Sequence, residues 1–405
     1  MARLAVISYH TSPLAQPGTG DGGGMNVYVR EMGSALARQG HSVDVFTRRD
    51  RAGLAPRHVV EPGFVVHHVD AGPRRPLLRD ELPQYVQTFT EALSRHFVVE
   101  GVPDALHANY WLSAEAAHRL KHEWDVPLMT TFHTLERVKA AQFEAESPER
   151  AAIEQQIFAC SDAVLASCDV EAAQFREFYD ADPSRIVVVP LGVEHAFFSP
   201  GERTAARDAL SWAGETVGLL YVGRLQALKG VDLALETAIK LRDRGRDITL
   251  AIVGGPSGPE GERTLSGLRQ RVTDAGMMGR VQFVAPQNHQ LLSSWMRAAD
   301  VTLVPSRSES FGLVALESAA CGTPVVASAV GGLLTLIKDG QNGALVESRD
   351  PEAWASAVER VIRANDDSSF SNAAVISARP YTWRASAERL TKVLERVSAH
   401  SLARC

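Results

Sequence analysis

The chain alternates short apolar strands with amphipathic segments from one end to the other, and the series restarts halfway along. A strand, a helical segment and a further strand form a right-handed unit in which the two strands lie parallel. The candidate strands are residues 4–8, 43–46, 65–69, 128–132, 163–167 and 186–189 in the first half, and 217–222, 249–253, 281–284, 301–304 and 325–327 in the second. The pattern predicts an α/β fold with two Rossmann-like domains, each built on a parallel sheet.

The length supports the same division, because 405 residues exceed what a single hydrophobic core usually organises. Residues 190–201, which begin with proline and end in Pro-Gly, read as the linker. We expect an N-terminal domain over residues 1–195, a C-terminal domain over 196–384, and a final helix within 385–405 that packs back on the first domain. Ligands of open parallel sheets bind at the carboxyl ends of the strands. We therefore expect the active site in a cleft between two facing sheets.

Charge and composition exclude several classes of protein. The net charge of −6 disfavours a nucleic-acid partner, and no apolar run reaches the roughly 20 residues of a membrane span. The first residues lack the pattern of a secretory signal, so we expect a cytoplasmic protein. The four cysteines (Cys160, Cys168, Cys321 and Cys405) show no metal-binding spacing. Four reduced thiols and no metal site are the expectation.

Two glutamates, Glu309 and Glu317, flank the start of a predicted helix. They follow the strand 301–304, and Phe311-Gly312 opens the helix between them. A helix N-terminus suits a phosphate, and carboxylates accept hydrogen bonds from sugar hydroxyls. The segment is therefore a candidate site for a nucleotide-sugar, although the spacing alone is equally typical of a strand-loop-helix with two solvated glutamates.

A glycine-rich loop precedes the amphipathic segment that starts near Met25. Gly18, Gly20 and Gly23 match G-x-G-x-x-G, but nine residues separate the first glycine from its strand, and the second strand ends in basic residues. Both features disfavour a dinucleotide-binding reductase. We expect instead that Gly24 and its neighbours let the backbone approach a phosphate or sugar closely.

Two basic residues, Arg224 and Lys229, lie in the loop after the strand 217–222. Positive charge at this position would stabilise a departing diphosphate without a metal ion. Isolated loop cations are usually only solvated, but together with the Glu309 segment they favour a phosphate site.

Three motifs in order resemble the family-4 retaining glycosyltransferases of GT-B architecture, over nearly the whole chain. The motifs are Gly223-Arg224-Leu-x-x-x-Lys229-Gly230, Glu309-x7-Glu317, and the His10-to-Gly24 loop. Further segments of the sequence are most similar to the branch of this family that transfers N-acetylglucosamine from UDP to 1D-myo-inositol 3-phosphate in mycothiol biosynthesis. These segments are Gly23-Gly-Met-Asn-Val-Tyr28, Tyr110-Trp-Leu-Ser113 and His133-Thr134-Leu135.

The resemblance implies a role for each donor-side residue. Arg224 and Lys229 would hold the diphosphate, Glu317 the ribose, and Glu309 with His133 the hydroxyls of the donor sugar. Of these, His133, Arg224, Lys229 and Glu309 are the expected catalytic residues. The remaining donor residues would border the nucleotide-sugar, and they are Gln16, Pro17, Gly24, Phe311, Gly312 and Leu313.

The resemblance also implies an acceptor site, where the sequence departs from the family at two positions. Arg79 stands where the family has a phosphate-binding lysine, and Asn109 where it has a histidine. The expected acceptor residues are His10, Asp21, Asn26, Arg79, Tyr110, Thr134 and Arg150. Two converging guanidinium groups would repel each other unless an anion is bound, which favours a phosphorylated acceptor. The alternative is that Arg150 only pairs with Glu149 or Glu154 on a helix surface.

The leading hypothesis is a UDP-sugar transferase that acts on a phosphorylated polyol with retention, by front-face displacement. No cofactor is expected for catalysis, a structural magnesium and a homodimer are both compatible with the family, and Asp180-Ala-Asp182 reads as a helix-end turn. The competing hypotheses are sucrose-phosphate-synthase-like transfer to a sugar phosphate, glycosylation of a lipid at a membrane surface, and a non-catalytic nucleotide-binding protein or reductase.

Overall fold

The structure, a computed structural model, describes residues 1–18, 20, 22–141, 146–212, 214–258, 260–365 and 368–405. The chain divides into two compact units. Unit 1 comprises residues 1–15, 24–190 and 383–405, and unit 2 comprises residues 16–23 and 191–382.

Unit 1 is built on an eight-stranded sheet with the order β3-β4-β2-β1-β5-β6-β7-β8. Its strands are β1 (Arg3–Ile7), β2 (Ser42–Arg48), β3 (Arg57–Glu61), β4 (Phe64–Val69), β5 (Ala105–Asn109), β6 (Leu128–Thr131), β7 (Ala163–Ala166) and β8 (Ile186–Val188). All pairs are parallel except β3 with β4, an antiparallel pair at the edge of the sheet. The sequence pattern does not reveal the edge strand β3 because it is polar and largely exposed. It does not reveal β5 because this strand has no β-branched residue and contains a histidine and an asparagine.

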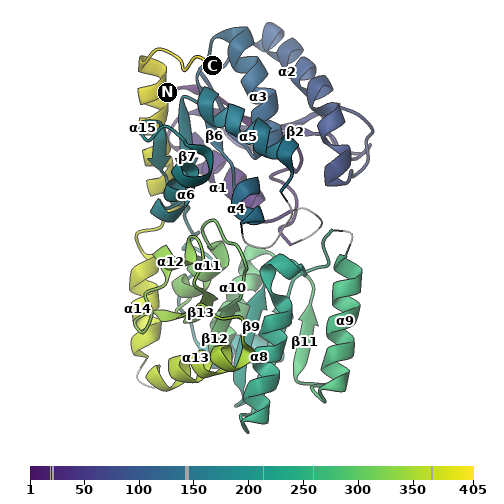
Figure 1. Cartoon of the computed structure of the whole chain (residues 1–405), viewed down its shortest axis with the longest axis vertical. Helices are drawn as coiled ribbons and strands as arrows, with labels where there is room; N and C mark the ends of the chain where they lie inside the picture. The colour runs from purple at the N-terminus through teal and green to yellow at the C-terminus, as the bar shows by residue number, and fades with distance from the viewer. Residues whose placement is uncertain (19, 21, 142–145, 213, 259, 366–367) are drawn as a thin grey trace. The chain divides into compact units, whose positions relative to one another are not determined.

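Helices cover this sheet, as Figure 1 shows. They are α1 (Gly24–Arg38), α2 (Val86–Glu100), α3 (Trp111–Trp124), α4 (Glu136–Ala140), α5 (Pro148–Cys160), α6 (Asp169–Tyr179) and α15 (Trp383–Ala399). The core lies between sheet and helices, where Ile7, Phe89 and Leu106 are fully buried. Burying each such side chain contributes about 1.5–3 kcal/mol.

Helix α15 comes from the end of the chain and packs on α1. The Tyr28 and Trp383 rings lie 6.2 Å apart, and the Gln39 side chain donates a hydrogen bond of 3.2 Å to the carbonyl of Arg384. Segments 350 residues apart in sequence thereby share one core, as the 3.1 Å contact between His41 and Thr391 also shows.

Unit 2 is built on a six-stranded parallel sheet with the order β11-β10-β9-β12-β13-β14. The strands are β9 (Val217–Val222), β10 (Ile248–Val253), β11 (Val281–Val284), β12 (Val301–Val304), β13 (Val325–Ser328) and β14 (Gly343–Val346). The helices are α7 (Arg203–Leu210), α8 (Val231–Asp243), α9 (Gly261–Asp274), α10 (His289–Ala298), α11 (Leu313–Ala320), α12 (Leu333–Leu336), α13 (Pro351–Ala364) and α14 (Ser369–Ala378). Every strand expected in this half is present, and the two Rossmann-like parallel-sheet units confirm the predicted fold class.

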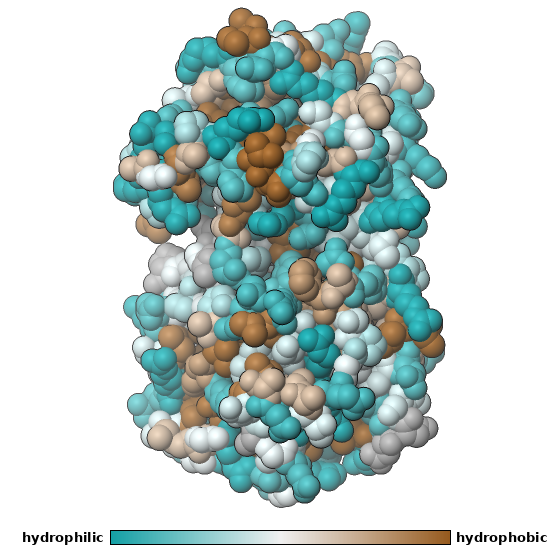
Figure 2. Space-filling view, turned by 180° about the vertical axis from the view of Figure 1, so that it is seen from behind, coloured by the Kyte–Doolittle hydropathy of each residue, from teal (hydrophilic) through white to brown (hydrophobic). Residues whose placement is uncertain are grey.

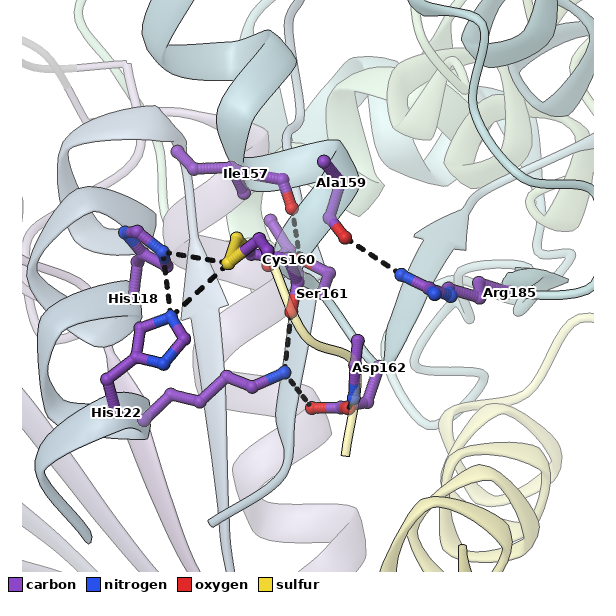
Figure 3. The surroundings of a disulfide bond; sticks show 12 residues. His118, His122, Ile157, Ala159, Cys160, Ser161, Asp162 and Arg185 are labelled. Atoms are coloured by element: carbon purple, nitrogen blue, oxygen red, sulfur yellow. Dashed lines mark hydrogen bonds and ion pairs between the residues drawn. A yellow bond between two sulfur atoms is a disulfide. The ribbon is translucent and has the colours of Figure 1, made fainter. Parts of the chain in front are cut away.

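The cysteines correct one expectation. Cys160 and Cys405 form a disulfide, with Cα atoms 5.3 Å apart, whereas Cys168 and Cys321 are free and buried. Figure 3 shows the bond at the end of α5, beside His118 and His122. The pair is 245 residues apart in sequence, so no local spacing could reveal it.

The surface is largely hydrophilic on the face drawn in Figure 2, where apolar side chains form small groups between polar ones. Among the described residues, none of the helices combines the length and the apolar character that crossing a bilayer requires.

Candidate active site

In unit 2, the loops after β9 and β12 bring the expected diphosphate and sugar residues together. These strands are neighbours in the sheet, so their following loops emerge side by side. Lys229, at the end of a short 3-10 turn (η3, Ala227–Lys229), places its ammonium 2.7 Å from Oε2 of Glu309. The Ser306 hydroxyl donates to the same oxygen at 3.2 Å. Both charged side chains remain partly exposed, at 25% for Lys229 and 18% for Glu309.

Close backbone contacts fix the position of these two loops relative to each other. The amide of Arg307 donates to the carbonyl of Leu228 at 2.8 Å. Gly230 has φ of 69°, and a Cβ there would lie 2.1 Å from the carbonyl oxygen of Pro305. Only glycine fits such a position. The loop that carries Lys229 and the loop that carries Glu309 are therefore positioned by backbone rather than by side chains.

Gly331 and Gly332 brace the Glu309 backbone from the other side. A Cβ on Gly331 would lie 1.8 Å from the carbonyl oxygen of Glu309, and the amide of Gly332 donates to that oxygen at 3.0 Å. The sequence interpretation missed this support. The Gly-Gly pair between β13 and α12 was the available signal.

Helix α11 begins where the Phe311-Gly312 pair predicts. Gly312 is the N-cap with φ of 104°, and Leu313 is the first helical residue. Phe311 is 3% exposed, with its ring 5.8 Å from that of Tyr381. Glu317 lies on the helix and is 6% exposed, so it is not the solvated glutamate of the alternative interpretation.

The glycine-rich loop, residues 16–23, packs with unit 2 although it precedes α1 of unit 1. The Gln16 side chain donates to the carbonyl of Gln287 at 2.8 Å, and Ser257 donates to the carbonyl of Gly20 at 2.6 Å. A Cβ on Gly23 would lie 3.7 Å from Nε of Arg224. The loop therefore places its backbone against a guanidinium group. Pro17 follows Gln16 and is half-buried, Gly24 opens α1, and Asp21 lies outside the described residues.

In unit 1, His133 lies just after β6 in the left-handed backbone region, with φ of 61°. Its Nε2 is 2.9 Å from Oδ1 of Asn109, and its ring packs edge-on against Tyr28 at 5.1 Å. Burial, aided by the neighbouring His107 and His10, lowers the pKa of His133 to about 3. The imidazole is therefore neutral at physiological pH, as a hydrogen-bonding partner for a sugar hydroxyl would be.

The expected acceptor residues of unit 1 form a second group around Tyr110. The rings of His10 and Tyr110 lie 4.5 Å apart, and the Arg150 guanidinium lies 5.1 Å from the Tyr110 ring. Tyr110 has φ of 78°, a strained value for a non-glycine residue that often marks a functional position. Asn26 donates to Thr11 and Ser12 at the base of the His10 loop.

Two further expected acceptor residues, Thr134 and Arg79, are exposed. Thr134 is exposed, and its carbonyl accepts from Arg150 at 3.0 Å. Arg79 lies on an exposed 3-10 turn (η1, Arg79–Glu81) after β4.

The environment of Arg150 corrects the expectation that its charge requires a bound anion. Arg150 is 8% exposed and makes ion pairs of 2.8 Å with Glu154 and 3.0 Å with Glu136. Tyr179 in turn donates to Glu154. Pairing with Glu154 was the stated alternative, but the pair is buried rather than on a helix surface. Two carboxylates already balance this guanidinium, so the pocket does not by itself imply a phosphorylated acceptor.

The Asp180-Ala-Asp182 pattern is a helix-end turn, as predicted. Asp180 caps α6 in the left-handed conformation, and Asp182 accepts hydrogen bonds from the amide and hydroxyl of Ser184 at 2.9 and 2.7 Å.

Comparison with known proteins agrees with this arrangement. Residues 23–192 match the glycosyl transferase 4-like domain, and residues 202–378 match the glycosyl transferases group 1 family. The D-inositol 3-phosphate glycosyltransferase of Geodermatophilus obscurus is 46% identical over 89% of this chain and 82% of its own. The enzyme of the same name from Mycolicibacterium gilvum is 45% identical over 94% and 86%, respectively.

Solved structures show the same fold. Sucrose-phosphate synthase from Thermosynechococcus elongatus superposes with a TM-score of 0.91 at 30% identity, covering 98% of this chain and 100% of its own. Anabaena HepE, solved with UDP and glucose, superposes at 0.77 with 17% identity over 98% of this chain and 100% of its own, a likeness of fold alone. The chain therefore belongs to the glycosyltransferase family that contains the D-inositol 3-phosphate glycosyltransferases, and it is a glycosyl-transferring enzyme of GT-B fold.

Proposed function

We propose that this enzyme transfers N-acetylglucosamine from UDP to 1D-myo-inositol 3-phosphate with retention of the anomeric configuration. The observation that carries the acceptor is the 45–46% identity, over most of both chains, to enzymes named for D-inositol 3-phosphate. The choice of UDP and N-acetylglucosamine rests on the resemblance of Gly23–Tyr28, Tyr110–Ser113 and His133–Leu135 to the branch of the family that uses this donor.

The loops of unit 2 suit a nucleoside diphosphate donor. An ammonium group has three donors, so Lys229 can keep its bond to Glu309 and still donate to a phosphate. Arg224, with Gly23 against it, adds a second positive charge. The N-terminus of α11 adds backbone amides and the positive end of the helix dipole. Together they would stabilise the charge that develops on the departing UDP.

The two carboxylates suit the two sugars of the donor. Glu309 directs one oxygen to Lys229 and Ser306, and its other oxygen can accept from a hydroxyl of the transferred sugar. Glu317, buried on α11, would accept from the ribose hydroxyls. In the transfer, the bond between C1 and the diphosphate oxygen breaks while the acceptor hydroxyl bonds to C1 from the same face. The acceptor proton passes to the departing phosphate.

His133 would contribute a neutral imidazole to the donor sugar. Its lowered pKa means that it does not bring a positive charge to the site. It would therefore orient a hydroxyl rather than neutralise the diphosphate, and no divalent metal is needed for the charge that Arg224 and Lys229 supply.

The acceptor would bind through His10, Asn26, Tyr110 and Thr134. Arg79 would bind its phosphate. Arg79 is exposed and can form a bidentate contact to phosphate. Arg150, already paired with Glu136 and Glu154, would hold the Tyr110 ring and the Thr134 backbone in place.

One observation favours a second acceptor class. The TM-score of 0.91 and 30% identity to a sucrose-phosphate synthase support a sugar phosphate such as fructose 6-phosphate as the alternative acceptor.

A substrate screen with the purified full chain tests the proposal. UDP-N-acetylglucosamine, UDP-glucose and a GDP-sugar would each be offered with inositol 1-phosphate, inositol 3-phosphate, unphosphorylated inositol and fructose 6-phosphate. UDP release and product mass would be measured. We expect the highest kcat/KM for UDP-N-acetylglucosamine with inositol 3-phosphate. Preference for fructose 6-phosphate would select the alternative, and equal use of inositol and inositol 3-phosphate would contradict both.

Exchange of Lys229 for methionine provides the matched check, with Lys240→Met as its control. Lys240 lies on α8 of the same unit and also faces a glutamate, Glu352, at 3.6 Å. Only the Lys229 variant should lose turnover, because only that lysine would contact the diphosphate.

A further inference from the structure

Four side chains that the glycosyl-transfer site does not use converge on one point of unit 1. His118 and His122 lie one turn apart on α3, Cys160 ends α5, and Cys405 lies in the segment after α15. Figure 3 shows the two imidazoles directed at the sulfur atoms. The four potential ligand atoms all lie within 4.8 Å of one another.

Three distances within the cluster, those among His118, His122 and Cys405, are close to the ligand–ligand distances of a tetrahedral zinc site. The two Nε2 atoms are 3.1 Å apart, and the Cys405 sulfur lies 3.5 Å from His118 and 3.3 Å from His122. Tetrahedral Zn²⁺, with bonds of about 2.0 Å to nitrogen and about 2.3 Å to sulfur, requires about 3.3 Å between nitrogens and about 3.5 Å between nitrogen and sulfur. Two histidines at i and i+4 on one helix face are also a common zinc-binding pair.

We propose that reduction of the Cys160–Cys405 disulfide converts this cluster into a Zn²⁺ site with His118, His122, Cys160 and Cys405 as its ligands. A dithiol reductant supplies two electrons and two protons, the sulfur–sulfur bond breaks into two thiols, and the reductant becomes a disulfide. Binding of Zn²⁺ then displaces both thiol protons to solvent, because the thiolate is the ligand. Four protein ligands fill a tetrahedral shell, so the site is structural rather than catalytic.

The frame around the cluster does not depend on the disulfide. One carboxylate oxygen of Asp162 accepts from the amide of Ala403 at 2.6 Å, which holds the segment that carries Cys405. The other oxygen accepts from the Leu128 amide at 2.7 Å and from Lys121 at 2.8 Å. Lys121 also donates to the carbonyl of Cys160 at 2.6 Å. Both cysteines therefore stay near the histidines after reduction, and Zn²⁺ would tie the same segment to α3 and α5.

Metal titration of the full chain tests this. The protein would be reduced with a dithiol, freed of reductant under nitrogen, and titrated with Co²⁺ and then Zn²⁺ against a chelating dye. We expect one equivalent of Co²⁺ to produce the intense thiolate-to-metal absorption of a tetrahedral site, and Zn²⁺ to displace it. The oxidised protein should bind at least 100-fold more weakly, because its sulfurs are then joined and carry no charge.

Two variants separate metal binding from disulfide formation. His122→Ala keeps both cysteines, and hence the disulfide, but removes one ligand, so reduced protein should bind Zn²⁺ at least 10-fold more weakly. His58→Ala is the control, because His58 is an exposed histidine on β3. Cys405→Ser should lose both the disulfide and the thiolate absorption. Transferase turnover would be measured in each variant to confirm folding.

Equal Zn²⁺ affinity in wild type and His122→Ala would overturn the proposal. Failure of the reduced wild-type protein to bind metal would also overturn it, and the cysteines would then serve only as a structural disulfide.

Discussion

Two charged pairs, Arg150–Glu154 in unit 1 and Lys229–Glu309 in unit 2, have nearly the same separation, 2.8 and 2.7 Å. They differ in exposure. The side chains of the first are 10% and 0% exposed, and those of the second are 25% and 18% exposed. An ion pair near a candidate site is therefore not by itself a ligand-binding feature.

The hydrogen-bonding partners of Arg150 and Lys229 explain the difference in exposure between the two pairs. Arg150 sits between two carboxylates and donates to the Thr134 backbone, so its hydrogen-bonding capacity is largely used within unit 1. Lys229 lies in a loop whose position is fixed by a glycine backbone contact, and its side chain stays partly exposed. We infer that the first pair positions neighbouring residues, while the second is available to a diphosphate.

The largest expected effect is on stability, for Arg150→Ala. Removing the guanidinium leaves Glu136 and Glu154 buried without their partner, which should cost about 3–5 kcal/mol in the free energy of unfolding. Chemical denaturation measures this, with Glu149→Ala as the control because Glu149 is exposed on the same helix. A variant of wild-type stability with only a raised acceptor KM would instead place Arg150 on the acceptor phosphate.

The next effect is on turnover, for Lys229→Ala and Arg224→Ala. Each should lower kcat by on the order of 100-fold, because each would stabilise charge on the leaving group. The free energy of unfolding should change by no more than about 1 kcal/mol, since these are loop charges. Steady-state kinetics and chemical denaturation of the same variants would show a large loss of kcat with little change in the free energy of unfolding. Unchanged kcat in both variants would contradict the proposed diphosphate site.

A smaller effect concerns the pH dependence of stability. Burial lowers the pKa of His107 to about 4, against 6.5 as the ordinary value. The unfolded chain therefore binds a proton below pH 6.5 that the folded chain does not. The contribution of His107 to the free energy of unfolding is therefore complete above pH 6.5. It is lost as the pH falls toward 4, by up to about 1.4 kcal/mol per pH unit.

His107→Gln isolates this contribution, because glutamine can still bond to Thr131, which His107 contacts at 2.9 Å. Other groups titrate in the opposite sense. Burial raises the pKa of Glu171 to about 7, so its contribution is lost as the pH rises through 7. The measured quantity is therefore the difference between wild type and variant across pH 4–7. Parallel curves would show that His107 is not held neutral.

The smallest expected effect is that of a chelator on the rate. Excess EDTA should leave kcat within about twofold, because Arg224, Lys229 and a helix N-terminus supply the positive charge. A structural metal would change the melting temperature rather than the rate. Complete loss of activity that Mg²⁺ restores would contradict a metal-independent transfer.

Much of the fold could be predicted because its signals are local. Alternating apolar strands and amphipathic segments predicted every strand of unit 2 except β14, and the Phe311-Gly312 pair predicted the start of α11. The pattern did not reveal β3, β5 and β14, because each is polar or poor in β-branched residues and depends on its neighbours in the sheet. The candidate residues Lys229 and Glu309 could be named because each follows a strand end, where ligands of such sheets bind.

The amino-acid sequence alone is enough to identify the α/β class, the family and the residue types of the candidate donor site, since each is encoded in short stretches of chain. Which of these residues meet depends on the three-dimensional fold. It placed the glycine-rich loop with unit 2, enclosed Arg150 between Glu136 and Glu154, and joined Cys160 to Cys405 beside His118 and His122. These contacts link positions far apart in the chain, and their energies depend on burial and on partners that no local pattern specifies.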